Sequence, residues 1–460
     1  MTPAVDLPGS DKGEIAVIVL ARSGRAVATL LRKNGYEVYA SDAAASEELH
    51  RCAAELRSLG ISTQVGGHDF NRLTRSSLVV VSPGVPPNAG PLELARVTDI
   101  PVVSEVEVAL HFLPDARIIA VTGTNGKTTT TALIAHILRQ LTSDVAEAGN
   151  IGTALSEVAS HNPQPSWIAL EMSSFQLHDT PSLQPLVGVL TNLTPDHLDR
   201  YSSVEDYFAD KEKLFARAIP ESHWVVNADD HRVRDMVAEV AGEQHRFSVE
   251  SETDAYYDSS TERLMLLGDH LLDRKQLPLL GTHNVANALA AALAVAVAAE
   301  AHRTPAARKS IADSLRAFRA LPHRLELVGE FGGVQWINDS KATNVSSTIV
   351  AIDGMERPTV LLLGGRHKGE PYVPLIEGIR GKVKRVIAYG EAAPLIERDL
   401  AGTVEIERLH DDFTAVLNAA RASARPGDAI LLSPACSSYD MFTDFEQRGD
   451  RFRALASGAR

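Results

Sequence analysis

The residues with the clearest chemical meaning form a short loop at 122–129, with the letters TGTNGKTT. An apolar stretch precedes this loop and a helical pattern follows it, so the segment is predicted to run strand, loop, helix. Backbone N–H groups of such a loop converge on a phosphate at the helix N-terminus, where the helix dipole also favours an anion. Lys127 is then placed to reach the β- and γ-phosphates of a nucleoside triphosphate, and the Thr128 hydroxyl to bind Mg²⁺.

The loop departs from the general P-loop pattern in one respect, because Val121 stands where the first glycine is expected. A tight strand-to-helix turn without a ligand is the alternative interpretation, and the strand and helix around the loop favour nucleotide binding. The residues expected around the phosphates are Gly123, Thr124, Asn125, Gly126, Lys127, Thr128 and Thr129.

Polar side chains end two further predicted strands of the same stretch. Glu171 closes an apolar run at 167–170, and Asp196 and His197 follow another at 187–190. Open α/β sheets bind their ligands at the carboxyl ends of the strands, so these groups are expected beside the metal of the nucleotide. Glu171 offers the hard oxygen donors that Mg²⁺ prefers, while an imidazole is a less typical ligand. For His197 alone, a hydrogen-bonded structural role is an equal alternative.

Other charged and polar residues are less specific. The run DKEK at 210–213 is by itself typical of a solvated helix face with i,i+3 and i,i+4 pairs. Four clusters in the last third of the chain, at 323–324, 338–344, 364–368 and 433–438, lie at or after predicted strand ends. Their cationic, hydroxyl and carboxylate groups suit a carboxylate-bearing substrate and the edge of a nucleotide.

The elements that must position these residues are those of an α/β protein. Three stretches repeat the pattern of a β-branched apolar run followed by polar residues or a helix, which predicts parallel sheets. Breaks near 112–116 and 321–322 divide the 460 residues into predicted domains at 1–113, 114–320 and 321–460. The expected fold has a Rossmann-like N-terminal domain, a P-loop-type central ATPase domain and a Rossmann-like C-terminal domain.

Composition excludes several classes of protein. The 45 Lys and Arg against 59 Asp and Glu give a net charge of −14, which argues against a nucleic-acid binder. The most apolar run, 288–299, is shorter than the roughly 20 residues that span a bilayer and predicts a buried helix, so no membrane insertion is expected. Two cysteines and an N-terminus without a signal-peptide pattern favour the cytoplasm, and we expect a monomer there.

Taken together, the motifs resemble those of the Mur ligase family over nearly the whole chain. They are TGTNGKTT (122–129), EMSSFQL (171–177), TPDHLDRY (194–201), GTHNVANALAA (281–291), LPHR (321–324), INDSKATN (337–344), LLLGG (361–365) and SPACSSYDMF (433–442). The first motif is shared with all Mur ligases and with folylpolyglutamate synthases, whereas INDSKATN and SPACSS resemble the members that add glutamate.

This resemblance implies a ligase whose N-terminal domain holds a UDP-sugar, whose central domain holds ATP and two Mg²⁺ ions, and whose C-terminal domain closes over both. The implied substrates are UDP-N-acetylmuramoyl-L-alanine and D-glutamate, joined through an acyl phosphate in peptidoglycan precursor synthesis. Lys127, His197 and Lys211 are the implied catalytic residues, with His197 also placed to help receive the proton of the amine. Lys211 falls where the family carries a carbamylated lysine, whose anionic oxygens would bind a second Mg²⁺.

The remaining implied contacts follow from matching positions. Asn150 matches the γ-phosphate region, and Asn284, Arg324 and Asp339 match nucleotide contacts. The implied metal ligands are Thr128, Glu171, His197 and Lys211. Positions near the UDP are Asp42, Ser82 and Gly84, and positions lining the D-glutamate pocket are Lys341, Thr343, Lys368, Ser438 and Phe445.

The chain departs from the family after its first strand. Where the family has a turn resembling G-x-G-x-x-G, residues 19–24 read VLARSG and keep only Gly24. We expect Arg22 and Ser23 to take over contact with the UDP pyrophosphate, and a solvated loop residue is an equal alternative for Arg22.

Three rival functions stay open. A related ligase would add a different residue, such as L-alanine to the UDP-sugar or glutamate to folate. A nucleotide-binding regulator that hydrolyses ATP slowly would leave the clusters of the last domain unexplained. A UDP-sugar binding module would have no use for the P-loop.

Overall fold

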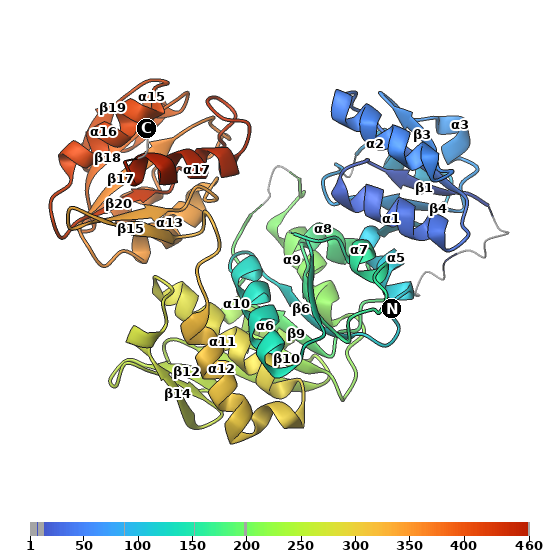
Figure 1. The fold of residues 1–460 in the computed structure, drawn as a ribbon, viewed down its shortest axis with the longest axis horizontal. Helices are drawn as coiled ribbons and strands as arrows, with labels where there is room; N and C mark the ends of the chain where they lie inside the picture. Colours follow the sequence, from blue (N-terminus) through green and yellow to red (C-terminus); the bar gives the residue numbers. More distant parts are fainter. Residues whose placement is uncertain (1–6, 8–12, 87, 151, 197–199, 459–460) are drawn as a thin grey trace. The chain divides into compact units, whose positions relative to one another are not determined.

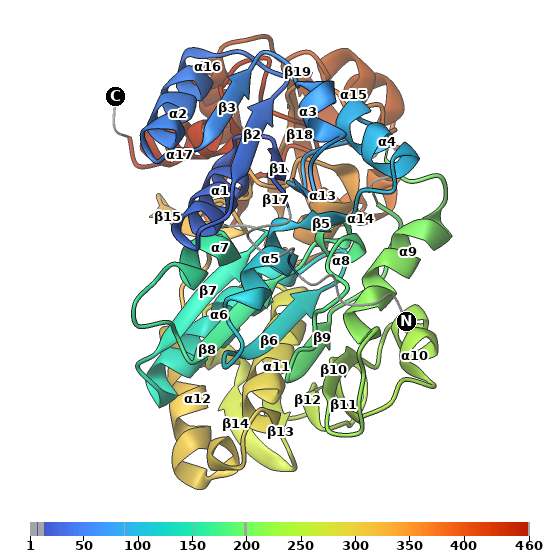
Figure 2. The same cartoon turned by 90° about the vertical axis from the view of Figure 1, so that its right-hand side faces the viewer.

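The computed structural model of the chain describes residues 7, 13–86, 88–150, 152–196 and 200–458, and its strands form three sheets (Figures 1 and 2). The chain divides into two compact units, one of Met1–Arg274 with Ala286–Arg316 and one of Lys275–Val285 with Ala317–Arg460. Two of the sheets lie in the first unit and the third lies in the second unit. Helices follow most strands in each sheet, which confirms the predicted α/β fold class.

The first sheet has the strand order β3-β2-β1-β4-β5 and is parallel throughout. Its strands are β1 (Ile15–Ile18), β2 (Val38–Asp42), β3 (Ser62–Val65), β4 (Leu78–Val81) and β5 (Val102–Ser104), and its helices are α1 (Arg22–Lys33), α2 (Glu47–Ser58), α3 (Phe70–Leu73), α4 (Gly90–Val97) and α5 (Glu105–His111). All four residues of β1 and of β4 are buried, because helices cover both faces of the sheet. The strand order reverses between β1 and β4, and such a switch point is where open α/β sheets bind ligands.

The second sheet has the order β14-β13-β12-β11-β10-β9-β6-β8-β7 among the described residues. Its strands are β6 (Arg117–Thr122), β7 (Val145–Gly149), β8 (Trp167–Glu171), β9 (Val187–Leu190), β10 (His223–Asn227), β11 (Glu243–Ser248), β12 (Ala255–Asp258), β13 (Arg263–Leu266) and β14 (Asp269–Asp273). The helical segments after these strands are α6 (Lys127–Leu141), α7 (Leu155–Ala159), α8 (Ser174–His178), α9 (Val204–Glu212), η1 (Lys213–Phe215), α10 (His231–Val237), η2 (Arg274–Gln276), α11 (Thr282–Val297), η3 (Glu300–Arg303) and α12 (Pro305–Ala317).

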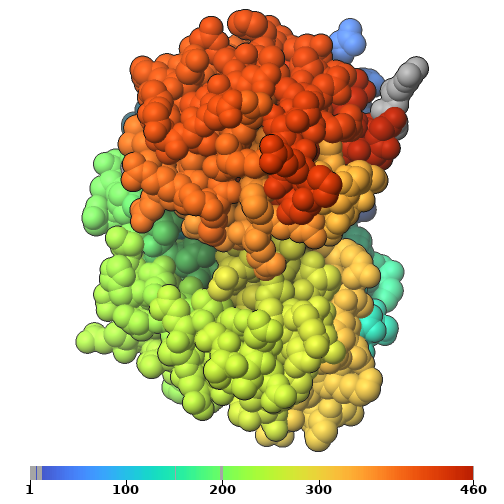
Figure 3. All heavy atoms as spheres, turned by 90° about the vertical axis from the view of Figure 1, so that its left-hand side faces the viewer, coloured from blue at the N-terminus to red at the C-terminus, as the bar shows by residue number. Residues whose placement is uncertain are grey.

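Part of this sheet differs from the prediction. Pairing is parallel from β7 to β12, as expected, but β12, β13 and β14 pair antiparallel at one edge. This extension has short alternating strands with exposed residues such as Arg263 and His270, and it lies on the yellow-green surface of this part of the chain in Figure 3. Such short strands give a weak sequence signal, so the extension was not expected.

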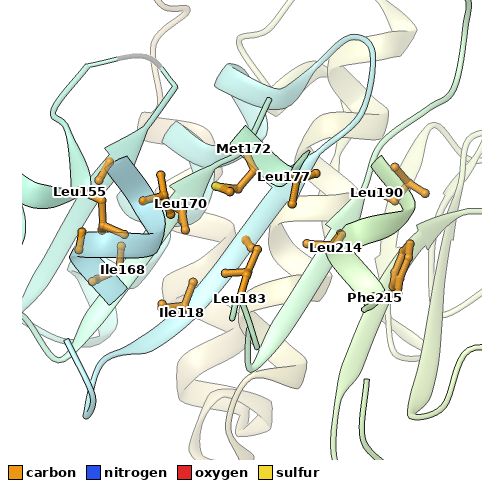
Figure 4. Packing of buried hydrophobic residues seen from close by; sticks show 14 of the residues in the cluster. Ile118, Leu155, Ile168, Leu170, Met172, Leu177, Leu183, Leu190, Leu214 and Phe215 are labelled. Carbon is orange, nitrogen blue, oxygen red and sulfur yellow. The ribbon is translucent and has the colours of Figure 1, made fainter. Parts of the chain in front are cut away.

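The core beside the second sheet joins one face of the central strands to short helices. Ile118 of β6, Leu170 of β8 and Leu190 of β9 pack with Leu177 of α8 and Phe215 of η1 (Figure 4). Residues 288–297 of α11 are also buried, which confirms the predicted buried helix. The strands that end at the candidate site therefore lie in well-packed surroundings, and packed strands hold polar side chains at their ends in defined positions.

The third sheet has the order β15-β16-β20-β17-β18-β19 and is parallel except for β15, which pairs antiparallel with β16. Its strands are β15 (Glu326–Phe331), β16 (Val334–Asn338), β17 (Thr359–Gly364), β18 (Val383–Tyr389), β19 (Glu405–Arg408) and β20 (Ala429–Leu432), and its helices are α13 (Val345–Asp353), α14 (Leu375–Ile379), α15 (Ala393–Asp399), α16 (Phe413–Ser423) and α17 (Phe445–Ala456).

The predicted domain limits fall between elements, at 113/114 between α5 and β6 and at 320/321 between α12 and β15, and they stay a prediction. Within the described part of the chain, no helix has both the length and the hydrophobicity to cross a membrane.

Candidate active site

The glycine loop links the carboxyl end of β6 to the start of α6, as predicted. Gly126 is the N-cap of α6 and has a φ of 84°, a left-handed conformation that favours glycine. A Cβ at Gly123 would lie 1.9 Å from the Thr191 hydroxyl oxygen, so only glycine fits there. The loop therefore combines a helix N-terminus with a tight backbone approach, which is the geometry of a phosphate-binding loop.

Residues after β9 hold this loop in place. The Thr191 hydroxyl donates to the Asn125 carbonyl at 2.6 Å, and the Asn192 side-chain oxygen accepts from the Asn125 backbone N–H at 2.9 Å. The Thr124 backbone N–H donates to the Asn192 carbonyl at 2.9 Å. Sequence reasoning did not assign these two supporting residues, although their place at the end of an apolar strand is a signal that could have found them.

The Lys127 ammonium folds back over the loop that carries it. Its Nζ donates to the carbonyl oxygens of Gly123, at 2.9 Å, and of Thr124, at 2.7 Å. Lys127 and Thr128 are the first two residues of α6, and Thr128 and Thr129 are both half-buried. The cation and the two hydroxyls thus surround the N-terminus where a phosphate would bind.

Glu171 lies at the end of β8, beside this loop in the sheet order. Its side chain is 2 % exposed, and its Oε1 accepts a hydrogen bond from the Asn150 side-chain N–H at 3.0 Å. The Asn150 backbone N–H also donates to the Glu171 carbonyl at 3.0 Å. The predicted metal ligand and the predicted γ-phosphate residue are thus neighbours, held by two hydrogen bonds.

Lys211 is buried in α9, and the interpretation of 210–213 as a solvated face is wrong for Asp210 and Lys211. Lys211 is 1 % exposed, and its Nζ donates to the Gly123 carbonyl at 2.7 Å and lies 4.5 Å from the centre of the Tyr207 ring. Burial lowers the pKa of the Lys211 ammonium well below its usual value, and Lys127 lowers it further. The neutral amine of Lys211 is therefore more accessible than that of an exposed lysine, and it lies at the P-loop.

Three carboxylates near Lys211, one of them in the same helix, partly oppose this shift of its pKa. They belong to Asp196, Asp210 and Glu171. Asp210 accepts from the Tyr201 hydroxyl at 3.0 Å and lies 2.7 Å from His178 Nδ1 and 2.9 Å from Lys213 Nζ. His197, predicted as a metal ligand and catalytic residue, lies outside the residues that the structure describes.

The first turn of the N-terminal sheet keeps a tight shape without its first two glycines. Val19 has a φ of 80°, a conformation that is uncommon for a β-branched residue. A Cβ at Gly24 would lie 1.8 Å from the Val19 carbonyl oxygen, so the retained glycine is the one that close packing requires. The altered segment thus preserves the turn at the switch point between β1 and β4.

The predicted UDP-contacting residues gather around this turn. Ser23 and Ser82 hydroxyl oxygens lie 3.0 Å apart, and the Arg22 guanidinium donates to the Gly152 carbonyl at 2.5 Å. Asp42 is buried, and its carboxylate accepts the backbone N–H groups of Leu20 and Ala44, each at 2.9 Å. The Asp42 carboxylate therefore supports the turn.

Gly84 follows β4 in the loop after Ser82. Among the described residues, a Cβ at Gly84 would meet no atom within 4 Å, so open space surrounds this position.

In the second unit, Asp339 follows β16 and is a buried carboxyl. Its oxygens accept from the Ser433 hydroxyl at 2.8 Å and from the Leu325 backbone N–H at 3.1 Å. Burial raises the pKa of Asp339 to about 7, while Ser433 and Arg324 oppose the rise. Asn284, in the first turn of α11, donates from its side chain to the Leu280 carbonyl at 2.8 Å.

The predicted amino-acid pocket residues come from separate loops of this unit. Lys341 Nζ lies 3.7 Å from the centre of the Phe445 ring, and Lys368 Nζ donates to the Thr343 hydroxyl at 3.3 Å. Ser438 is buried in the loop after β20. Two pairs of these residues are thus in direct contact, and two of their members are lysines suited to bind carboxylates.

One buried residue that sequence reasoning missed joins two of these loops. Arg448 in α17 is fully buried, and its guanidinium donates to the Ser340 carbonyl at 2.8 Å and to the Cys436 carbonyl at 3.2 Å. Its Nε donates to the Ser340 hydroxyl at 2.9 Å. No local pattern marks an arginine inside a charged helix, so its role depends on the tertiary fold.

Fold and site together define an α/β enzyme that uses a nucleoside triphosphate, with a P-loop, a buried carboxylate and a buried lysine at one sheet edge. The family model described as Mur ligase middle domain matches residues 121–295, and that described as Mur ligase, glutamate ligase domain matches residues 323–436. The chain belongs to the Mur ligase family and is an ATP-dependent ligase.

Relatives match nearly the full length of the chain. Proteins named UDP-N-acetylmuramoylalanine--D-glutamate ligase from Acidobacterium capsulatum and Anaeromyxobacter dehalogenans are 38% and 39% identical to it over 455 and 457 residues. These alignments cover 96% of this chain in both cases, and 95% and 97% of the relatives.

Solved structures show the same fold at lower identity. UDP-N-acetylmuramate-alanine ligase from Thermotoga maritima has a TM-score of 0.62 at 19% identity, covering 97% of this chain and 100% of that one. A pseudomurein peptide ligase type C from Methanothermus fervidus has a TM-score of 0.59 at 18% identity, with 97% and 100% coverage. Expectations of a three-domain Mur-type α/β fold are thereby confirmed.

Proposed function

We propose that the protein adds D-glutamate to UDP-N-acetylmuramoyl-L-alanine with consumption of ATP, as a step of peptidoglycan precursor synthesis. The observation that carries this proposal is the match to relatives of that activity over 95–97% of the chain. The P-loop, Glu171 and Lys211 at one sheet edge support the phosphate chemistry. In the second unit, Lys341 against Phe445 and Lys368 against Thr343 support binding of an acidic amino acid.

The reaction balances in two steps. The alanyl carboxylate attacks the γ-phosphorus of ATP, which forms an acyl phosphate and releases ADP. The amine of D-glutamate then attacks the activated carbonyl, forms the amide bond, expels inorganic phosphate and loses a proton. Lys127 at the P-loop neutralises charge that would otherwise repel the carboxylate from the phosphates.

Donors suited to Mg²⁺ are present beside the P-loop. Glu171 supplies a buried carboxylate and Thr128 a hydroxyl, both hard oxygen donors of the kind that Mg²⁺ prefers. When bound, Mg²⁺ supplies positive charge that offsets the phosphate oxygens. An unmodified Lys211 ammonium would repel a metal ion, which is why the state of this residue matters.

We propose that Lys211 is carbamylated in the working enzyme. The neutral amine attacks CO₂, forms an N–C bond and loses a proton, leaving an anionic carbamate with two oxygen donors. Support comes from the burial of Lys211 and from the lowered pKa of its ammonium, which makes the neutral amine accessible. The carbamate oxygens would hold a second Mg²⁺ near the loop.

The residues that we propose to bind D-glutamate and to contact the nucleotide from the second unit come from several of its loops and helices. Lys341, Thr343, Lys368, Ser438 and Phe445 are proposed to line the D-glutamate pocket, with Arg448 holding two of its loops together. Asn284, Arg324 and Asp339 are proposed to contact the nucleotide.

We propose a cytoplasmic monomer, because the acidic chain carries two cysteines and its substrate is a nucleotide-linked sugar.

Phosphate release with crossed substrates tests the function. The full chain is assayed with ATP and Mg²⁺, with or without UDP-N-acetylmuramoyl-L-alanine, and with D-glutamate, L-glutamate or L-alanine. Rapid release only with the UDP-sugar and D-glutamate together is expected, because the acyl phosphate turns over when an amine traps it. A rate of phosphate release that is the same with and without the two substrates would contradict ligation and favour a nucleotide-hydrolysing regulator. Release with another amino acid would identify a different ligase.

A further inference from the structure

A second cluster of metal-binding side chains lies in the central sheet, apart from the P-loop. His223 begins β10, and Glu243 and His245 lie in the neighbouring strand β11. His223 is paired with Glu243, and Val225 with His245, in a parallel register, so the three side chains point to the same face of the sheet. Within the described residues, this is the group of three whose possible ligand atoms all lie within 4.8 Å of one another.

The spacing of the three groups matches that of ligands around one ion. His223 Nδ1 lies 3.1 Å from His245 Nε2 and 3.5 Å from a Glu243 carboxylate oxygen, and His245 Nε2 lies 3.8 Å from the other oxygen. Ligands bonded to Zn²⁺ at about 2.0–2.2 Å in a tetrahedron are separated by about 3.3–3.6 Å. A single ion can therefore touch all three with small side-chain adjustments.

The protonation states also suit a metal. The hydrogen bond between the two rings requires one ring nitrogen with a proton and one without. Neutral imidazoles are the form that binds metals, and a change of tautomer in one ring frees both nitrogens without loss of a proton.

We propose that His223, Glu243 and His245 form a site for a divalent transition-metal ion of the zinc class, separate from the active site. Two imidazoles and a carboxylate favour Zn²⁺ or Co²⁺ over Mg²⁺, which prefers oxygen ligands. Glu243 is 60 % exposed, so solvent can supply the fourth ligand. The bound ion ties the starts of β10 and β11 together.

The position of the site separates it from the proposed ligase chemistry. His223 is level with Val187 of β9, whereas the P-loop follows Thr122, which is level with Leu190 at the other end of β9. Three residues of strand correspond to about 10 Å, and β6 is two strands away from β10. Metal binding here is therefore expected to stabilise the sheet and to leave the catalytic groups in place.

Zinc titration of the full chain by calorimetry, in millimolar Mg²⁺ to occupy sites that favour oxygen ligands, tests the proposal. One Zn²⁺ per chain should bind at this site, and Co²⁺ there should show the visible absorption of tetrahedral coordination. His223→Asn and Glu243→Gln each remove one ligand. Each should weaken binding by at least about tenfold, which is the loss seen when only an outer-shell partner of a ligand is removed.

A matched control is His270→Asn, which removes an exposed histidine of the same sheet whose Nε2 lies 3.2 Å from an Asp273 carboxylate oxygen. This variant should bind zinc as the unaltered chain does. Zn²⁺ should also raise the thermal midpoint of the unaltered chain and of His270→Asn, but not that of His223→Asn. Zinc affinity that is unchanged in His223→Asn and Glu243→Gln, with all variants folded by their metal-free midpoints, would overturn the site.

Discussion

Lys211 and Lys127 converge on one backbone group, because both ammonium nitrogens donate to the Gly123 carbonyl oxygen, at 2.7 Å and 2.9 Å respectively. Two like charges at one acceptor are unfavourable, and burial together with the Lys127 charge lowers the pKa of the Lys211 ammonium. The neutral amine of Lys211 is therefore more accessible than that of an exposed lysine, while the Lys127 ammonium lies over the loop that would bind the phosphates. This relationship separates the roles of two lysines that belong to the same site.

Replacing Lys211 by Ala should remove most of the ligase activity, because the proposed carbamate supplies oxygen ligands to a metal. Formate should restore part of the activity of Lys211→Ala by offering a small carboxylate in the vacated space. Lys127→Ala is the control, since formate cannot replace a cation there. Initial rates of phosphate release with and without formate measure both. Full activity of the unaltered enzyme in CO₂-depleted buffer, with no formate effect, would reject carbamylation.

Replacing Lys127 by Ala should lower kcat by at least about tenfold, since hydrogen bonds to charged groups contribute about 1.5–3 kcal/mol. The interaction strengthens as charge moves onto the transferring phosphoryl group, so kcat should fall and not only the KM for ATP rise. Lys309→Ala, a change at an exposed lysine of α12, should leave both constants unchanged. Steady-state kinetics with varied ATP test this. A near-normal kcat in Lys127→Ala would argue against the P-loop role.

Replacing Arg22 by Ala should raise the KM for the UDP-sugar by about tenfold or more if its guanidinium contacts the pyrophosphate. Arg22 lies at the altered turn, and one of its N–H groups already donates to Gly152. Arg25→Ala, three residues further along the same helix and ion-paired with Glu55, is the matched control. The KM values for ATP and D-glutamate should hardly change. An unchanged KM for the UDP-sugar would leave Ser23, Gly24 and the loop after β4 to bind the phosphates.

Replacing Glu105 by Gln should change how stability depends on pH. Glu105 is 2 % exposed, and burial raises its pKa to about 7, although hydrogen bonds from the backbone N–H and the side chain of Ser156 oppose this. Between pH 4.5 and 7 the folded chain holds a proton on Glu105 that the unfolded chain has lost, so this group makes stability fall as pH rises. By pH 8 the cost reaches about 3 kcal/mol.

Thermal midpoints at pH 5 and pH 8 measure this effect. Glu105→Gln should raise the midpoint at pH 8 and change it little at pH 5, because glutamine keeps an acceptor for Ser156 without a charge. Glu93→Gln, at an exposed position of α4, should leave the pH dependence as it is. Equal midpoint differences at both pH values would show that Glu105 does not titrate in this range.

The sequence by itself determined the P-loop, the parallel strand that ends in Glu171, the strand that Asp339 follows, and the family. These features depend on local order: an apolar run buried on both faces predicts a strand, and a glycine loop before a helix predicts an anion site. Their positions along the chain are enough, because the carboxyl ends of parallel strands in one sheet meet at one edge.

Only the tertiary structure decided which charged residues are buried and what they contact. Lys211 looks like a solvated helix residue in sequence, yet α9 packs its side chain against the P-loop carbonyl of Gly123. The same holds for Arg448, whose partners lie in other segments of the chain. It holds also for the cluster of His223, Glu243 and His245, which two separate strands bring together. Burial and partner charges determine protonation and metal binding, and both depend on three-dimensional packing that no short stretch of sequence contains.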